Sequence, residues 1–366
     1  MKFLSRTLPG MALATVLAAC STDIPTEAAP TDLAAAKGGP GVATHTSIDI
    51  GAMLGGYASR VNDVNDAGDV VGVVFSSSSC CAFAIIGDIL TQLPGNGREA
   101  HAISNSSPLH VVGYSGAAGV PTQPLRWTIS DGVSSQPASL ELGGASYGSA
   151  TGVNDAGEAV GYAGASAAIW SADGSLTAIS PPQGFAIGRG RDINNSGHAV
   201  FDFGPVSLNE NARAYLRLAS GALFELPPRA GDPTSHGTGI SDVENNMVYI
   251  SGYSEAPRLS DTGPVPSRAV RWTVDVNTGG IIATQVRQED SYANGVSNAG
   301  GVVGVLRGRK AGPYLWRGTE LLTLKPPKGM REGWAFAISP SGEFVAGEAY
   351  SPKVGSNAVR WTILSP

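Results

Sequence analysis

The chain has 366 residues, with 24 Lys and Arg against 30 Asp and Glu, and therefore a net charge of −6 at neutral pH. This acidic balance argues against nucleic acid and anionic lipid headgroups as partners, because both need a basic protein surface. The 49 Gly and 24 Pro residues, with only 15% charged residues, predict many tight turns between short buried strands and thus an all-β fold.

Residues 1–20 have the features of a lipoprotein signal peptide. Lys2 and Arg6 precede an apolar run, Met11 to Ala19, which is shorter than the roughly 20 residues that cross a bilayer. The run ends in Leu17-Ala18-Ala19-Cys20, which resembles a bacterial lipobox. We expect Cys20 to carry the lipid on its sulfur and to anchor the protein in the cell envelope, at the outer membrane. The alternative is an ordinary secretory signal with an incidental cysteine at its cleavage site.

Residues 21–44 are rich in Ala, Pro, Thr and Gly and contain too few aliphatic residues to form a core. We therefore expect a disordered tether, with residues 45–366 forming the folded domain. Removal of the signal leaves 22 Lys and Arg against 30 Asp and Glu, a net charge of −8.

A short phrase then recurs seven times along the domain. Its clearest copy is Val64-Asn65-Asp66-Ala67-Gly68-Asp69-Val70-Val71-Gly72, and the others begin at residues 103, 153, 193, 240, 296 and 338. The second position is always Asn or Ser, which bonds the backbone at the start of a turn, and Gly follows three residues later in five copies. The phrase therefore predicts a β-hairpin. A period of roughly 40 to 50 residues predicts a β-propeller.

Each unit also carries a strand that ends in Trp or a degenerate copy of it. The five clear examples end at Trp127, Trp170, Trp272, Trp316 and Trp361. In a strand the second and fourth positions share one face, and here that face is mostly large and apolar. We expect these Trp residues to pack between blades; a sugar-stacking array is the alternative.

The phase of the repeat predicts how the ring closes. The chain enters mid-unit at residues 47–51 and leaves just after Trp361-Thr362-Ile363-Leu364, so the two ends together make one complete unit. We expect them to pair in one sheet, which leaves no open edge there. Six continuous units and this composite predict seven blades of four strands each.

The phrases resemble the HAF-type extracellular repeat of bacterial secreted proteins. That repeat combines a His-Ala-Phe-x-Trp strand, an Asp-Leu-Gly-x-Leu-Gly-Gly turn and an Ile-Asn-x-x-Gly-x-Val-Val-Gly strand. Its closest copy here is residues 48–56 followed by 64–72, and the resemblance covers nearly all of residues 45–366. It implies an exported, propeller-like protein, but it implies no activity and no functional residues.

Cysteine, serine and histidine give weak signals for chemistry. Cys80 and Cys81 are adjacent in a hairpin loop, where they either form a vicinal disulfide or stay free, with an incidental or loop-stiffening role favoured. Ser146 sits in a Gly-x-Ser-x-Gly pattern, but a catalytic serine there needs a strand-to-helix elbow that a repeat turn does not supply. The five histidines are scattered, and we expect structural roles for all of them: His45 at the end of the tether, and His101, His110, His198 and His236 beside strands or in loops.

Charged side chains recur at equivalent positions of several units. Asp63 begins a faint calcium-loop pattern that lacks the required carboxylate at its twelfth position, so a hairpin explains it better. Asp155 and Asp242 occupy equivalent turns and could contribute to a ring of carboxylates on one face. Arg126, Arg271 and Arg360 share another slot, from which they could face those carboxylates or the central channel, with structural ion pairs as the default. We predict no catalytic residue, metal or cofactor.

These observations predict a non-enzymatic binding or adhesion module for an unknown protein or glycan ligand, with one propeller face as its contact surface. Longer insertions at residues 228–238, 255–266 and 285–292 would contribute to that face. A second hypothesis is an envelope hydrolase or lyase, which two channel carboxylates with raised pKa values would favour. Exposed aromatic and polar loops without such a pair would favour binding. A third hypothesis is a scaffold for envelope assembly.

Overall fold

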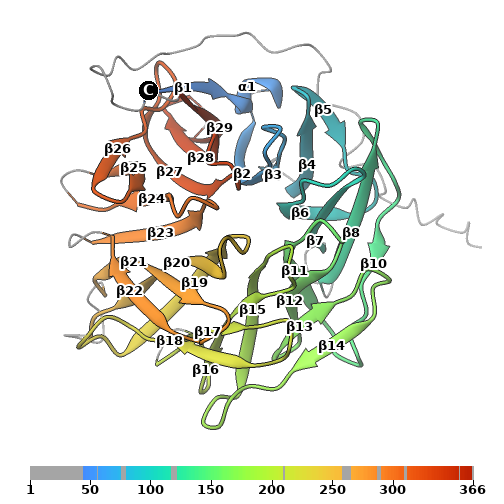
Figure 1. Cartoon of the computed structure of the whole chain (residues 1–366). Coiled ribbons are helices and arrows are strands. Elements are labelled where there is room, and N and C mark those ends of the chain that lie inside the picture. The colour runs from blue at the N-terminus through green and yellow to red at the C-terminus, as the bar shows by residue number, and fades with distance from the viewer. Residues whose placement is uncertain are drawn as a thin grey trace, which may run out of the picture.

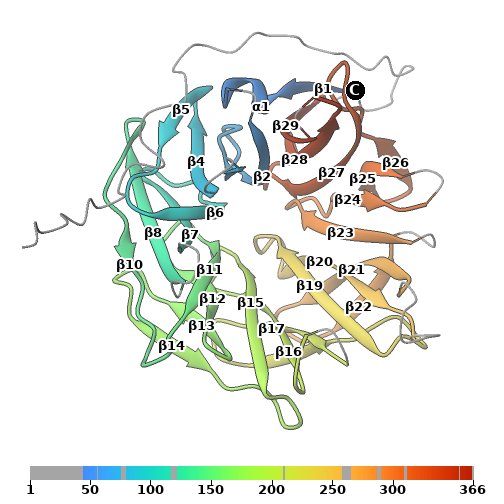
Figure 2. The same cartoon turned by 180° about the vertical axis from the view of Figure 1, so that it is seen from behind.

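In the computed structural model, seven antiparallel sheets surround a central axis as the blades of a β-propeller (Figure 1, Figure 2). The structure describes residues 44–364 except 56, 76–79, 117–121, 209–210, 258–264, 287–289, 309–310 and 354. The predicted signal peptide, Cys20 and the tether up to residue 43 lie outside the described residues. The predicted all-β, seven-bladed fold is confirmed.

We number the blades from 1 to 7 in chain order and give their strands from the axis outward. Blade 1 contains β2 (Ala58–Val64), β3 (Val70–Phe75), β4 (Cys80–Ile86) and β5 (Ile89–Gln92). Blade 2 contains β6 (Gly97–Ile103), β7 (Leu109–Ser115), β8 (Gln123–Ser130) and two short strands that pair with β8, β9 (Val133–Ser134) and β10 (Ala138–Ser139). Blade 3 contains β11 (Gly148–Val153), β12 (Ala159–Ala163), β13 (Ser166–Trp170) and β14 (Leu176–Ile179).

The remaining blades follow the same plan. Blade 4 contains β15 (Ile187–Ile193), β16 (Ala199–Gly204), β17 (Arg213–Arg217) and β18 (Leu223–Leu226). Blade 5 contains β19 (Thr234–Ile240), β20 (Met247–Glu255), β21 (Ser267–Asp275) and β22 (Ile281–Gln285). Blade 6 contains β23 (Ser291–Val296), β24 (Val302–Leu306), β25 (Gly312–Arg317) and β26 (Glu320–Thr323). Blade 7 contains β27 (Arg331–Ile338), β28 (Phe344–Ser351), β29 (Gly355–Leu364) and β1 (Thr44–Asp49).

The two ends of the described chain close the ring in blade 7, as predicted. β1 pairs with β29 in antiparallel register from Thr44 opposite Leu364 to Asp49 opposite Val359. His45 was expected at the end of the tether and instead lies in β1, 1% exposed, where its Nε2 accepts the backbone N–H of Lys325 at 2.7 Å. That expectation was wrong because the closing strand begins at Thr44.

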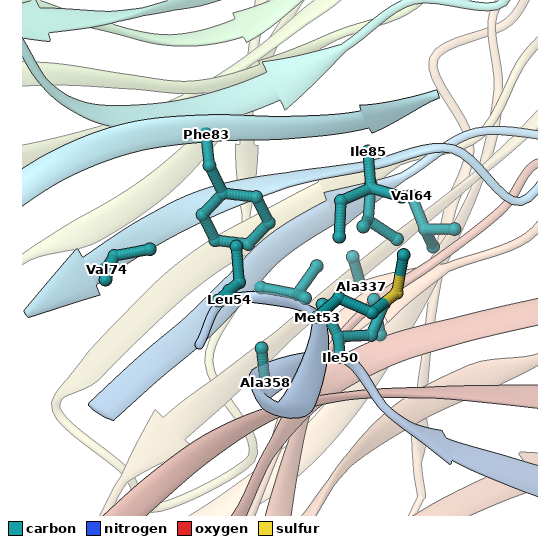
Figure 3. Close-up of a cluster of buried hydrophobic side chains, with 12 residues drawn as sticks. Ile50, Met53, Leu54, Val64, Val74, Phe83, Ile85, Ala337 and Ala358 are labelled. Carbon is teal, nitrogen blue, oxygen red and sulfur yellow. The ribbon is translucent and has the colours of Figure 1, made fainter. Parts of the chain in front are cut away.

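The junction between blades 7 and 1 is sealed by a short helix that the sequence did not predict, α1 (Ile50–Met53). The side chain of Asp49 accepts the N–H of Ala52 and caps its start. Figure 3 shows Ile50, Met53 and Leu54 of this segment packed against apolar side chains of both blades, among them Phe83 and Ala358. Burial of this cluster holds the first and last units together.

The repeated Trp residues form the core, and the sugar-stacking alternative is wrong for them. Trp127, Trp170, Trp272 and Trp361 are fully buried, and Trp316 is 7% exposed. In each of the four fully buried Trp residues, the indole N–H donates to a backbone carbonyl of the loop that enters the blade. The acceptors are, in chain order, Pro94, Glu141, Pro227 and Lys325. Each indole therefore fills the space between blades and also fixes the loop.

The Gly that ends the Val-Val-Gly phrase has a steric cause. It lies in the second strand of six blades, at Gly72, Gly113, Gly161, Gly252, Gly304 and Gly347. A Cβ at any of these positions would collide with a backbone carbonyl oxygen of the inner strand. Only Gly lets the two strands approach this closely.

Candidate functional site in the central channel

The two faces of the propeller carry different structures. Because strands alternate in direction, one face carries the turns between first and second strands and between third and fourth strands; we call it the turn face. The other face, the loop face, carries the remaining connections, including the predicted insertions. The predicted insertion at residues 228–238 is shorter than expected, because residues 234–238 belong to β19.

Each inner strand contains a β-bulge whose extra residue lies three positions before the Asn or Ser of the repeated phrase; β6 and β27 have a second register shift near their starts. The seven bulge residues are Asn62, His101, Thr151, Arg191, Thr238, Asn294 and Phe336. All seven line a cavity of about 160 Å³ in the channel. A bulge re-aims a side chain, and here it turns one residue per blade toward the axis.

Five of the bulge residues link neighbouring blades. Asn62, His101, Thr151, Thr238 and Asn294 each bond, at 2.8–3.0 Å, the backbone carbonyl just before the bulge of the next blade. Arg191 and Phe336 do not make this bond: Arg191 bonds Asp202 instead, and Phe336 has no polar group. These two positions are therefore free of the structural role that the other five perform.

A second ring of hydrogen bonds closes the channel at the turn face. In each turn a backbone N–H donates to an oxygen of the next turn, and the ring returns to its start when Ser341 donates to Asp66 at 2.7 Å. The seven donors are Asp66, Asn105, Asp155, Asn195, Asp242, Asn298 and Ser341, and the N–H of Asn298 donates to the carbonyl of Pro340. Asp155 and Asp242 thus lie in one ring on this face, but it is not a ring of carboxylates alone. Its acceptors are the carboxylates of Asp66, Asp155 and Asp242, the amides of Asn105, Asn195 and Asn298, and the carbonyl of Pro340. The repeated turn is therefore a connector between blades as well as a hairpin.

The three arginines that share one position of the repeat bind the turns. We expected them to face carboxylates or the central channel, and this was wrong because the contact that all three share is with a turn carbonyl. Arg126, Arg271 and Arg360 each donate to the carbonyl of the turn Gly in the next blade, at Gly157, Gly300 and Gly68. Of the three, Arg360 alone adds an ion pair with a described residue, Asp88 at 2.8 Å. A cation at the Gly carbonyl satisfies a backbone acceptor that the hairpin leaves unpaired.

Two carboxylates lie in the wall of the cavity. Asp63 accepts the N–H groups of Val64 and Ile103, and Asp192 accepts those of Ile193 and Ile240, at 2.8–3.0 Å. Burial raises the pKa of Asp63 to about 7 and the pKa of Asp192 to about 6, and each backbone bond offsets part of this rise. Because every carboxylate oxygen already accepts a backbone N–H, both groups also join one blade to the next. The Asp63 calcium-loop pattern is not realised.

Arg191 belongs to a charged network between blades 4 and 5. Its guanidinium lies 2.8 Å from the fully buried carboxylate of Asp202, which also bonds His236 at 3.1 Å and the N–H of Gly237 at 2.9 Å. Burial is the largest single effect and opposes ionisation of Asp202, but the charge of Arg191, the bond and charge of His236 and the N–H of Gly237 together outweigh it and hold the pKa of Asp202 below its usual range. The side chain of Arg191 remains 36% exposed and lines the cavity.

Toward the loop face, the residue two positions before each bulge is polar or aromatic. These seven residues are Arg60, Glu99, Ser149, Arg189, His236, Tyr292 and Trp334. Arg60 forms an ion pair with Glu99 of the next blade. Tyr292 and Trp334 of adjacent blades lie with ring centroids 6.4 Å apart.

Exposed aromatic side chains are segregated on the loop face. Tyr57, Phe75, Tyr147, Trp334 and Tyr350 expose between 37% and 54% of their surface. Four of them lie at or near loop-face ends of strands or in the adjoining loops, Trp334 lies within β27, and the aliphatic Val206 is also exposed on this face. On the turn face, the large exposed apolar residues among those described are aliphatic: Ile89, Val133, Ile282 and Leu364. The loop face is therefore the face equipped with aromatic contact groups.

The other predicted candidates take no part in this site. Ser146 lies in a turn with no helix after it, so the nucleophile elbow is absent. Cys81 is disulfide-bonded, but the side chain of Cys80 lies outside the described residues, so the bond between the two stays a prediction. Of the histidines, only His101 and His236 reach the channel wall; His110 and His198 lie near the turns.

No group of three or more His, Cys, Asp or Glu is placed to hold a metal ion among the residues described. Within the same residues, no helix is long and apolar enough to cross a membrane.

The bulge residues were missed at the sequence level, although a signal existed. Their position, three before the Asn or Ser, is chemically varied, although the phrase that follows it is nearly uniform. Variation inside a regular repeat marks positions that the fold does not dictate, and such positions are where function is placed.

Comparisons with known proteins support the fold alone. No protein-family model and no characterised sequence matches the chain. Virginiamycin B lyase from Staphylococcus aureus is similar in structure, with a TM-score of 0.52, 13% identity, and coverage of 88% of this chain and 100% of that one. The β-propeller domain of the Trilobed protease from Pyrococcus furiosus has a TM-score of 0.49 and 10% identity, covering 84% of this chain and 95% of that one.

Proposed function

We propose that the protein is a lipid-anchored, cell-envelope propeller of the HAF-repeat type that binds its ligand on the loop face without catalysis. The observation that carries this proposal is the segregation of Tyr57, Phe75, Tyr147, Trp334 and Tyr350 on that face. Aromatic side chains exposed together mark recognition surfaces, because they supply large rigid contact areas at small entropic cost. The turn face, occupied by bonds between blades, offers fewer such groups.

The binding proposal is tested with isolated bacterial envelope fractions and two matched variants. One carries Tyr57→Ala, Tyr147→Ala and Trp334→Ala on the loop face, and the other carries Ile89→Ala, Val133→Ala and Leu364→Ala on the turn face. We expect the loop-face variant to lose co-sedimentation with the fractions while the turn-face variant retains it. Equal retention by both variants, or loss by the turn-face variant alone, would contradict the proposal. Circular dichroism confirms that both variants are folded.

The lipid anchor is tested separately. Cys20 is the only cysteine in the lipobox-like segment, and its thiol is the group to which the lipid would attach. We expect Cys20→Ala to move the protein from the membrane fraction to the soluble fraction. Retention in the membrane fraction after a salt wash would show that another element anchors the protein.

A hydrolase or lyase remains the second candidate, and a specific observation favours it. Asp63 and Asp192 both line the channel cavity, and their pKa values are raised to about 7 and about 6. Such values suit general acid–base catalysis near neutral pH. We rank this candidate lower because all four carboxylate oxygens already accept backbone N–H groups.

The catalytic candidate is tested with Asp63→Asn and Asp192→Asn in assays that follow the breakdown of envelope polysaccharide. Catalysis by this pair predicts turnover in the wild type with a bell-shaped pH profile, lost in either variant. Binding without catalysis predicts no turnover at any pH.

A further inference from the structure

The inner wall of the channel at the loop face is chemically divided between two sides. The inner strands of blades 5, 6 and 7 carry aromatic residues at these positions, and those of blades 1 and 4 carry Arg60 and Arg189. Arg60 lies 5.7 Å from the ring centroid of Phe336 on the aromatic side, so Arg189 is the arginine that stands apart from the rings of that side. In Figure 1 the inner strand of blade 4, β15, lies across the central space from β27 of blade 7. A ligand in this mouth would therefore meet aromatic faces on one side and a cation on the other.

The aromatic side is a continuous arc across three blades. His236, Tyr253, Tyr292, Trp334 and Phe336 follow one another with ring centroids 4.7–6.4 Å apart. Tyr292, Trp334 and Phe336 are inclined to their neighbours by only 26° and 31°, and Trp334 is 39% exposed. These nearly parallel rings form a platform, but Arg307 lies 5.3 Å from the ring centroid of Tyr292 and Arg60 lies 5.7 Å from that of Phe336. Trp334 is therefore the ring of the platform that is exposed to polarised C–H groups of a ligand, which its partially negative face attracts.

The cationic side is built around Arg189. Its guanidinium lies 4.1 Å from the ring centroid of Tyr162, and Nη1 donates to the carbonyl of Gly188 at 2.7 Å. Among the described residues no carboxylate lies within 4.0 Å of Arg189, whereas Arg60 is paired with Glu99 and Arg191 with Asp202. Arg189 is thus a positioned, half-buried guanidinium whose charge is not neutralised by the neighbouring protein.

Aliphatic residues such as Val153 and Ile193 line the deeper cavity, whereas the positions of the inner strands nearer the loop face carry polar or aromatic side chains. The bulge residues and the residues two positions before them make fourteen positions, and none of these is aliphatic. They comprise amides, hydroxyls, histidines, charged groups and three aromatic rings. Such a surface matches a ligand with many hydroxyl groups and one flat C–H face, which describes a saccharide.

We propose that the loop-face mouth of the channel binds an acidic saccharide, with a sugar ring on the Tyr292–Trp334–Phe336 platform and a carboxylate on Arg189. The inference rests on the proposed loop-face binding function and specifies its ligand class. A guanidinium without a protein counter-charge gains a charge-assisted hydrogen bond from a carboxylate, which a neutral sugar does not supply.

Tryptophan fluorescence gives a local readout for this site. The other five Trp residues are at most 7% exposed, so Trp334 is the one that responds to a ligand in the mouth. The probe is oligogalacturonate, with its methyl ester as the uncharged match. We expect saturable quenching by oligogalacturonate and about tenfold weaker binding of the ester, since a hydrogen bond to a charged group contributes about 1.5 kcal/mol.

Three variants assign the response to named residues. Arg189→Gln should weaken oligogalacturonate binding about tenfold and leave ester binding unchanged. Trp334→Phe should abolish the fluorescence change while calorimetry still detects binding. Arg213→Gln, on β17 of the same blade and paired with Glu225, is the matched control and should change neither affinity.

The outcomes separate this inference from the proposed function. Equal affinity for the acid and its ester, no effect of Arg189→Gln, or no binding of either saccharide would overturn the acidic-saccharide assignment. Tighter binding of polyglutamate than of oligogalacturonate would overturn it in favour of a peptide ligand. If the loop-face variant still loses envelope binding in any of these cases, the loop-face function stands and only the ligand class is wrong.

Discussion

Replacement of Thr151 by Val tests whether the bulge residues stabilise the ring. Thr151 Oγ1 lies 3.0 Å from the carbonyl oxygen of Gly190 in the next blade and 3.2 Å from that of Val160 in its own. Valine keeps the β-branched shape and removes only the hydroxyl, whose single hydrogen makes one of these bonds at a time. We expect a loss of about 1 kcal/mol in the free energy of unfolding, the usual net value of one such bond.

The corresponding change in melting temperature is small but measurable. An unfolding entropy of about 2.1 cal/mol/K per residue over about 320 residues gives roughly 0.7 kcal/mol/K, so Tm should fall by ~1.5 °C. Differential scanning calorimetry measures it against Thr177→Val, an exposed threonine on β14 of the same blade, which should change Tm little. Thr151→Ser keeps the hydroxyl and should restore most of the loss. If Thr151→Val melts no lower than Thr177→Val, the bulge bond does not stabilise the propeller.

Three further predictions use the same calorimetry. Gly161→Ala would press a Cβ against the carbonyl of Ser149 and should cost at least about 2 kcal/mol, whereas Gly116→Ala has room; equal effects would refute the steric argument. Trp272→Phe leaves a cavity and frees the carbonyl of Pro227, and should cost about 2 kcal/mol, against under about 0.5 kcal/mol for the exposed Trp334→Phe. A Trp272→Phe protein that melts with the wild type would contradict the core assignment. The pKa of Asp63, raised to about 7 by burial, means that the folded chain holds a proton there which the unfolded chain releases near pH 4. The protonated Asp63 contributes its full stabilisation below pH 4, and this stabilisation is lost as the pH rises to 7. The free energy of unfolding of the wild type should therefore fall by about 2–4 kcal/mol relative to Asp63→Asn between pH 4 and pH 7. A difference that is constant with pH would show that the Asp63 carboxyl titrates normally.

Much of the fold could be predicted because the residues of each repeat determine its turns and its buried face locally. The Asn or Ser with a following Gly specifies a hairpin, and the Trp of the third strand specifies the buried face. Counting these phrases predicted seven blades, and the incomplete units at Ser47 and Leu364 predicted the pairing of β1 with β29. These features depend on residues within one unit, or on the simple requirement that a sheet edge be covered.

The candidate site could not be predicted in the same way, because it is built from contacts between units. Asp66 meets Asn105, and Thr151 meets the carbonyl of Gly190, only when neighbouring blades pack side by side. The bulge that turns His101 or Phe336 toward the axis changes the strand alternation by one residue, and nothing in the alternation itself predicts it.

The sequence alone determined the number of blades, their hairpins, their Trp cores and the joining of the two ends, since these follow from local turn chemistry and strand periodicity. Only the tertiary structure decided that the repeated turns form a closed hydrogen-bonded ring on one face, and that exposed aromatic rings gather on the other. Ring closure brings one chemically varied position from each of seven distant units onto one channel wall, and this arrangement does not exist in any single repeat.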